Sequence, residues 1–93
     1  MSEISPAKPP HHVLKRSGAL VPFDAGKIRS AMERAGAASG EFSGGEAELL
    51  ALQAVKVLAH RFAGRMPSIE EIQDVVEQVL ISANHFATAR AYI

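Results

Sequence analysis

Between residues 12 and 28 a basic turn separates two short apolar runs, and this segment constrains the fold most. Residues 12–16 and 19–23 have the composition of strands, and Gly18 in the turn between them can adopt the positive φ of a tight hairpin. Asp24 follows directly and is a preferred residue at a helix N-cap. The segment therefore predicts a β-hairpin whose second strand leads straight into a helix.

Apolar residues at helical spacing predict a first helix after Asp24. Gly36 and the glycine-rich stretch around Gly40 are expected to end it. Its apolar series is Ile28, Ala31, Met32 and Ala35, at the i, i+3, i+4, i+7 spacing of one helix face.

Two capping-box patterns predict the starts of the next two helices. Ser43 with Glu46 predicts the second helix, which ends at Gly64, and Ser68 with Glu71 predicts the third. The apolar side expected for the second helix is Leu49, Leu52, Val55, Ala59 and Phe62. The side expected for the third is Ile69, Ile72, Val75, Val76, Val79 and Leu80. A short fourth helix is expected from about Asn84, with inward-facing Phe86, Ala89, Tyr92 and Ile93.

These elements predict one small α+β domain that is mainly helical. Apolar residues make up 47% of the 93 residues, enough for a core. No apolar run approaches the roughly 18 residues of a membrane span, and the N-terminus lacks the pattern of a signal peptide. We therefore expect a cytoplasmic protein without a membrane partner. The absence of cysteine excludes disulfides, thiolate metal sites and thiol chemistry in this chain.

The two ends of the chain differ from its middle. Residues 1–11 are rich in proline and poor in apolar side chains, which predicts a disordered leader before a domain over residues 12–93. The chain stops at Ile93 while its sequence is still apolar and helical. This ending is expected of a fragment of a longer protein.

The formal net charge is zero, but basic residues gather in the first part of the chain. Residues 8–34 carry six basic side chains against two acidic ones, which predicts an anionic ligand. The excess is too small for a nucleic-acid binder. Lys15, Arg16 and Lys27 could hold a polyphosphate together with the N–H groups of the first helix turn. Alternatively, Lys15 and Arg16 are charged gatekeepers of an exposed hairpin.

No catalytic or metal-binding pattern stands out. The four histidines lack the spacing of zinc motifs. A Walker A loop is absent, because Gly26-Lys27 is followed by Ile28 and Val21 stands where the first glycine of that loop is needed. We therefore expect no catalytic residue and no metal ligand, and a nucleotide would be held by the hairpin instead.

Three motifs, in order, resemble those of the ATP-cone domain. Val13-x-Lys15-Arg16-x-Gly18 followed by Pro22-Phe23-Asp24-x-x-Lys27-Ile28 resembles the opening signature of that family. Residues 67–80 resemble its third helix, and His85-Phe86-x-x-Ala89-x-Ala91-Tyr92-Ile93 resembles its ending. The resemblance covers about residues 12–93.

This resemblance implies a small β-sheet covering a four-helix bundle, with a regulatory rather than a catalytic role. ATP-cones lie mostly at the N-terminus of ribonucleotide reductase large subunits, where ATP activates and dATP inhibits overall activity. The last two motifs look most like those of anaerobic or cobalamin-dependent reductases. The implied partners are an adenine nucleotide, the catalytic domain of the parent reductase and a second cone. The sequence leaves open whether Mg²⁺ accompanies the triphosphate.

The resemblance also implies roles for individual residues of the hairpin. Lys15 and Arg16 would meet the phosphates, and Ser17 and Gly18 would shape the loop. Val13 belongs to the same set of implied nucleotide-binding residues.

Further implied contacts come from the helices. Asp24 would accept a hydrogen bond from the adenine amino group, which selects adenine over guanine. Lys27 would lie at the ribose or the phosphates, and Ile28 against the base. Gln73 falls where the family places a residue near the sugar, and Arg90 could add charge from the last helix.

Two departures from the family pattern keep other functions open. Ser17 stands where the turn usually has an aspartate, and Val21 is apolar where some relatives have an acid near the base. One alternative is a degenerate cone that acts as a helical protein-interaction module without nucleotide. Another is the cone of a transcriptional repressor of reductase genes, although a proline-rich leader stands here where that protein has a four-cysteine zinc ribbon.

Overall fold

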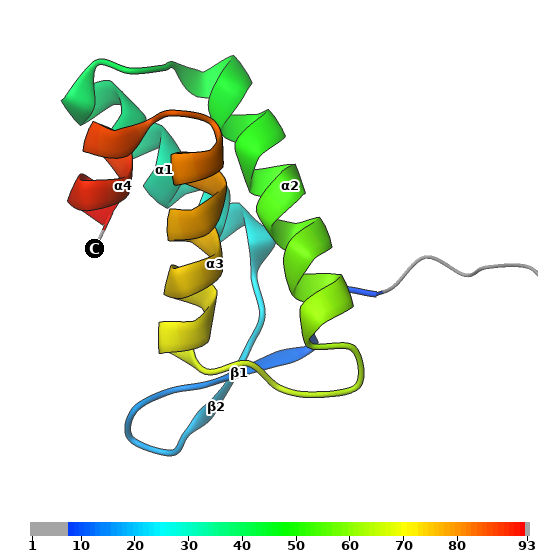
Figure 1. Cartoon of the computed structure of the whole chain (residues 1–93). Helices are drawn as coiled ribbons and strands as arrows, with labels where there is room; N and C mark the ends of the chain where they lie inside the picture. The colour runs from blue at the N-terminus through cyan, green and yellow to red at the C-terminus, as the bar shows by residue number, and fades with distance from the viewer. Residues whose placement is uncertain (1–7, 93) are drawn as a thin grey trace, which may run out of the picture.

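The computed structural model describes residues 8–92 and contains a two-stranded sheet and four helices (Figure 1). The strands are β1 (His12–Leu14) and β2 (Leu20–Pro22), and the helices are α1 (Ala25–Ser39), α2 (Gly44–Arg61), α3 (Ile69–Ser82) and α4 (Phe86–Tyr92). The predicted α+β, mainly helical class is confirmed. Most of the expected leader (residues 1–7) and the expected inward position of Ile93 lie outside the described residues.

The turn between β1 and β2 has the geometry predicted from its glycine. The Lys15 N–H donates to the Ala19 carbonyl at 2.9 Å and closes a loop over residues 16–18. Gly18 ends this loop with a φ of +90°, as the left-handed position of a three-residue hairpin loop requires. Strand pairing on either side is antiparallel.

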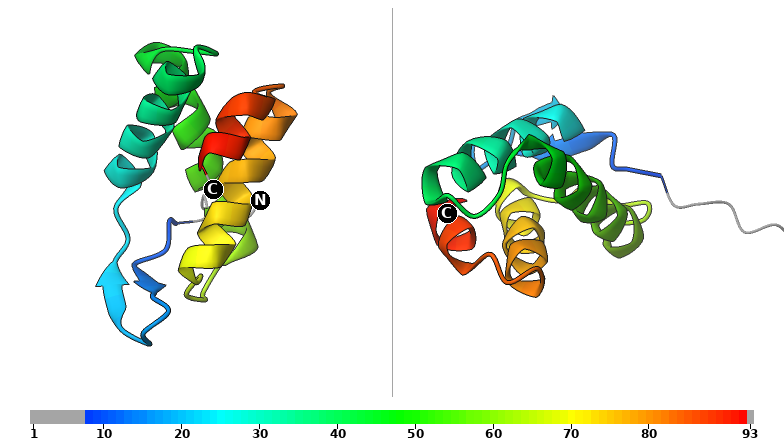
Figure 2. Two further views of the ribbon diagram at one scale, coloured as in Figure 1. Left: turned by 90° about the vertical axis from the view of Figure 1, so that its left-hand side faces the viewer. Right: turned by 90° about the horizontal axis from the view of Figure 1, so that it is seen from above.

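The hairpin lies at the end of the bundle where α1 and α3 begin, as both side views show (Figures 1 and 2). The Leu14 N–H donates to the Pro67 carbonyl at 3.0 Å, and Leu14 pairs with Ser68 in a parallel bridge. Val13 points into the core and is 4% exposed. These contacts place β1 beside the first turn of α3.

The four helices surround one core. α1 packs against α2 and α4, and α3 packs against the same two helices. The largest apolar side chains with almost no exposed surface come from α1, α2 and α3: Met32, Leu58, Val75, Val76 and Leu80. None of the helices described over residues 8–92 combines the length and apolar character that a bilayer-spanning segment needs.

The end of α1 lies at Gly40, so the expectation that Gly36 helps to end the helix was wrong. Gly40 adopts a φ of +78° and its N–H donates to the Gly36 carbonyl, which is a typical glycine cap. Gly36 lies inside the helix, where a Cβ would come within 2.4 Å of the Phe42 ring. A residue without a side chain is therefore required there by close packing, not by helix termination.

The apolar face predicted for α2 was wrong in part. Leu49 and Leu52 are 67% and 53% exposed, whereas Leu50 and Leu58 are buried. Alanines share the buried face (Ala47, Ala51, Ala54 and Ala59). Small side chains let neighbouring helices approach closely, so the inward face of α2 combines these alanines with Leu50 and Leu58 and leaves Leu49 and Leu52 outside.

Of the two predicted capping boxes, the one at α3 is confirmed and the one at α2 is wrong. Ser68 Oγ accepts from the Glu71 N–H at 3.1 Å, and Glu71 Oε1 accepts from the Ser68 N–H at 2.9 Å. At α2 the Ser43 side chain makes no capping hydrogen bond with any residue in the described range. Glu46 Oε2 instead lies 2.6 Å from Nε2 of His85, which belongs to the loop between α3 and α4.

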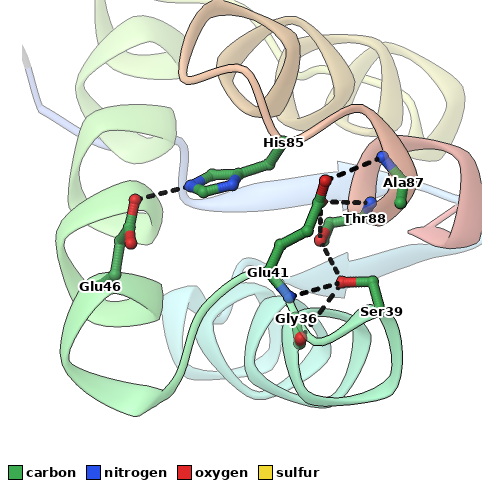
Figure 3. A network of polar contacts seen from close by, with 7 residues as sticks. All are labelled: Gly36, Ser39, Glu41, Glu46, His85, Ala87 and Thr88. Atoms are coloured by element: carbon green, nitrogen blue, oxygen red, sulfur yellow. Dashed lines mark hydrogen bonds and ion pairs between the residues drawn. The ribbon is translucent and has the colours of Figure 1, made fainter.

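A polar network joins the α1–α2 loop to the start of α4 (Figure 3). Glu41 accepts hydrogen bonds from the backbone N–H of Ala87 and from both the N–H and the hydroxyl of Thr88. These bonds, the Thr88 hydroxyl first, lower the pKa of the Glu41 carboxyl. Thr88 is fully buried and Phe86 is 55% exposed, so the predicted inward position of Phe86 was wrong. The network turns the polar Thr88 inward and leaves Phe86 on the outer side.

Candidate functional site

A cavity of about 300 Å³ opens between the hairpin, α1, α3 and α4. This volume is at the lower end of the range for small-molecule sites. The hairpin and the segment after it supply Val13, Lys15, Val21, Pro22, Phe23 and Asp24. The helices supply Lys27, Ile28, Ile69, Ile72, Gln73 and Tyr92.

Strand alternation and helix capping explain how neighbouring residues reach this cavity. Val13 and Lys15 lie two residues apart, so they point to the same side of the hairpin. Asp24 caps α1, because its Oδ1 accepts from the Gly26 N–H at 2.9 Å. This cap fixes the first turn of α1, which brings Lys27 into the cavity lining.

The cavity has an apolar floor and a charged rim. Val13, Ile28 and Ile72 are buried side chains that also belong to the core, whereas Lys15 and Lys27 are exposed. The titratable groups of the lining are these two lysines, Asp24 and the Tyr92 phenol. Burial raises the pKa of Tyr92, partly offset by the positive charge of Arg34, so the phenol stays neutral near pH 7.

Such a lining suits a ligand with a flat apolar part and an anionic end. Apolar side chains can cover a ring, and the two ammonium groups can pair with an anion. Asp24 adds an acceptor and Gln73 adds an amide that can donate and accept. Together these groups provide both hydrophobic contact and hydrogen-bonding selectivity.

The structure brings part of the predicted site together. Val13, Lys15, Asp24, Lys27, Ile28 and Gln73 line one cavity. Arg16, Ser17, Gly18 and Arg90 lie outside this lining. Arg16 forms an ion pair with Glu70 on α3, and Ser17 Oγ accepts from the Ala19 N–H within the hairpin loop. The role of each residue toward a ligand stays a prediction.

Other lining residues were not expected at a site. Ile69 and Ile72 were predicted as core residues, but they share one face of α3 with Gln73 at i, i+3 and i+4. That spacing could have placed all three together. Tyr92 was expected to face inward, and it closes the cavity from α4. Phe23 adds a half-buried aromatic ring between the hairpin and α1.

Comparison with protein families gives a match over almost the whole chain. Residues 11–93 match the model of a family described as the ATP cone domain. This range includes every residue of the cavity lining.

Similar sequences occur in several reductases. The chain is 39% identical over 82 residues to the anaerobic ribonucleoside-triphosphate reductase of Salmonella typhimurium, covering 88% of this chain and 11% of the relative. It is 42% identical over 71 residues to the vitamin B12-dependent ribonucleoside-diphosphate reductase of Thermoplasma acidophilum, covering 76% of this chain and 9% of the relative. It is 32% identical over 91 residues to ribonucleoside-diphosphate reductase subunit alpha of Chlamydia muridarum, covering 87% of this chain and 9% of the relative. The chain thus spans about a tenth of the length of these relatives.

Proposed function

The chain belongs to the ATP cone domain family, and on that premise we propose that its cavity binds an adenine nucleotide as an allosteric effector. The effector would be ATP or dATP. The regulated activity would be that of a ribonucleotide reductase of which residues 12–93 form a regulatory domain. Catalysis itself would belong to the rest of such a protein.

The observation that carries this proposal is the convergence of Lys15, Asp24, Lys27 and Ile28 on one cavity. The ammonium groups of Lys15 and Lys27 would pair with phosphate oxygens. The adenine ring would lie against Ile28 and the apolar floor. Asp24 uses Oδ1 for the α1 cap, so its other oxygen would accept from the adenine amino group.

The expected affinity follows from these contacts. A hydrogen bond to a charged group contributes about 1.5–3 kcal/mol. Contacts from Lys15, Lys27 and Asp24, together with burial of the base, would reach about −8 kcal/mol, which corresponds to a micromolar Kd.

Regulation requires that ATP and dATP stabilise different forms of the domain. The two nucleotides differ only in the 2′-hydroxyl, so their differential contacts would come from groups near the sugar. Gln73 is the amide of the lining and would serve this role. Tyr92, the last residue of α4, also lines the cavity, so a shift of Gln73 on nucleotide binding would change the position of α4.

Calorimetry and thermal unfolding test the proposal directly. With a Kd of about 1 μM, about 100 μM ATP would stabilise the domain by about 2.7 kcal/mol, or raise the Tm by roughly 10 °C or more. GTP should raise it far less, because Asp24 would face a carbonyl oxygen instead of an amino group. Titrations with and without Mg²⁺ would establish whether the metal accompanies the triphosphate.

Charge reversal supplies the matched controls. Lys15→Glu and Lys27→Glu should abolish ATP binding, whereas Lys56→Glu, an equal charge change on α2 outside the cavity, should leave it unchanged. If wild-type protein binds no nucleotide, or binds GTP as well as ATP, the proposal is wrong. A helical interaction module without nucleotide would then be the better description.

A further inference from the structure

Arg16 in the hairpin loop forms an ion pair with α3. Its Nε donates to Glu70 Oε2 in the first turn of α3, at 2.5 Å. The Arg16 and Glu70 side chains are 78% and 48% exposed, so both groups are accessible to solvent and to ligands. Lys15, the residue before Arg16, faces the cavity instead.

The pairing follows from the way β1 is attached to α3. Leu14 and Ser68 form a parallel bridge, so two residues further along each segment Arg16 and Glu70 are neighbours. Glu70 lies in the first turn of α3, where the helix dipole favours a negative charge. The hydrogen bond from Arg16 is the main reason that the pKa of Glu70 is lowered.

Glu70 lies close to the cavity without lining it. Gln73, three residues further along α3, is about 60° away around the helix and does line the cavity. A phosphate chain that extends from the cavity toward Lys15 would therefore end near the Arg16–Glu70 pair. The phosphate oxygens and the Glu70 carboxylate would then compete for the guanidinium of Arg16.

We propose that Glu70 is a positioning residue that competes with the nucleotide phosphates for Arg16. This inference rests on the proposed function. Binding then exchanges one anionic partner of Arg16 for another, so that Arg16 adds less affinity than an unpaired arginine would. Only a phosphate chain long enough to reach Arg16 meets this competition. Glu70 thus lowers the affinity for ATP more than the affinity for AMP and narrows the difference between the two nucleotides.

A purely structural role for the pair has the opposite consequence. If the ion pair only fastened the hairpin to α3, removing it would loosen Lys15 and weaken nucleotide binding. The sign of the change in affinity therefore separates the two roles.

The test is calorimetric titration of ATP and AMP into the wild type and Glu70→Gln. Exposed ion pairs contribute little each, so removing the competitor should tighten ATP binding about two- to fivefold. The gain should be smaller for AMP. Asp74→Asn removes the same charge from an exposed position one turn along α3 and should change ATP affinity much less. Glu70→Ala should act in the same direction as Glu70→Gln.

A double-mutant cycle isolates the contact. In an Arg16→Gln background, Glu70→Gln should lose most of its effect on ATP binding, because the group under competition is gone. An unchanged or weaker ATP affinity in Glu70→Gln would overturn the inference. So would an equal gain in Asp74→Asn, or an undiminished gain in the Arg16→Gln background.

A second measurement does not depend on affinity. The Arg16 Nε–H resonance should shift in Glu70→Gln and should also shift when ATP is added to the wild type. If ATP binds the wild type without moving this resonance, the inference fails and the proposed function stands. If the wild type binds no nucleotide, both fail.

Discussion

Ser43 and Ser68 occupy the same sequence pattern at two helix starts, yet substituting them should have different costs. Ser68 Oγ accepts a hydrogen bond from the Glu71 N–H, and Glu71 returns one to the Ser68 N–H. Ser43 has an extended backbone, but its side chain makes no such bond within residues 8–92. Ser68→Ala therefore removes a bond that Ser43→Ala does not.

The expected difference in stability between the two variants follows from the known cost of removing a helix N-cap. Replacing a serine N-cap by alanine costs typically about 1 kcal/mol, within a range of about 0.5–2 kcal/mol. An exposed residue without such a bond changes stability by less than about 0.5 kcal/mol. For a domain of this size, 1 kcal/mol corresponds to a Tm shift of about 4–8 °C. Ser68→Ala should therefore melt several degrees below Ser43→Ala.

Thermal and urea unfolding followed by circular dichroism measure both variants against the wild type. Equal m-values would show that the two substitutions change stability and not the extent of unfolding. Equal losses in Ser43→Ala and Ser68→Ala, or no loss in Ser68→Ala, would refute the assignment of the caps.

Two further predictions concern packing and pH. Because Leu50 is 5% exposed, Leu50→Ala should lower the free energy of unfolding, measured in urea, by about 2–5 kcal/mol. Leu49→Ala should lower it by less than about 0.5 kcal/mol. Similar losses in the two variants would contradict the observed face of α2. The folded-state pKa of Glu41 is lowered, so its carboxylate stabilises the fold above the ordinary value of 4.5. That contribution is lost as the pH falls through the lowered pKa. The Tm difference between wild type and Glu41→Gln should thus shrink below about pH 4.5, and a constant difference would count against the Glu41–Thr88 contact.

Local signals were sufficient to predict where the elements lie. The helix cap and the two turns depend only on the backbone and nearest neighbours of Asp24, Gly18 and Gly40. The local sequence is therefore enough to predict them. The face of α2 could not be predicted in this way. Leu49 and Leu50 are equally apolar, and the choice between them depends on which side α1 and α3 can approach.

The same division holds for the candidate site. Its hairpin and α1 residues come from one continuous segment, and helical spacing relates Ile69 and Ile72 to Gln73. The Arg16–Glu70 pair joins residues 54 positions apart. It depends on the parallel bridge between Leu14 and Ser68, which no pattern in either segment predicts.

The shortest helix shows how such long-range contacts support the cavity. α4 has seven residues, fewer than an isolated helix needs for stability in water, so tertiary contacts must hold it in place. Glu41 and the buried Thr88 fix its start, and Tyr92 at its end closes the cavity. A weakened Glu41–Thr88 contact would therefore loosen the wall formed by Tyr92. If the domain binds nucleotide as proposed, Glu41→Gln should reduce ATP affinity above pH 4.5, although Glu41 lies outside the lining.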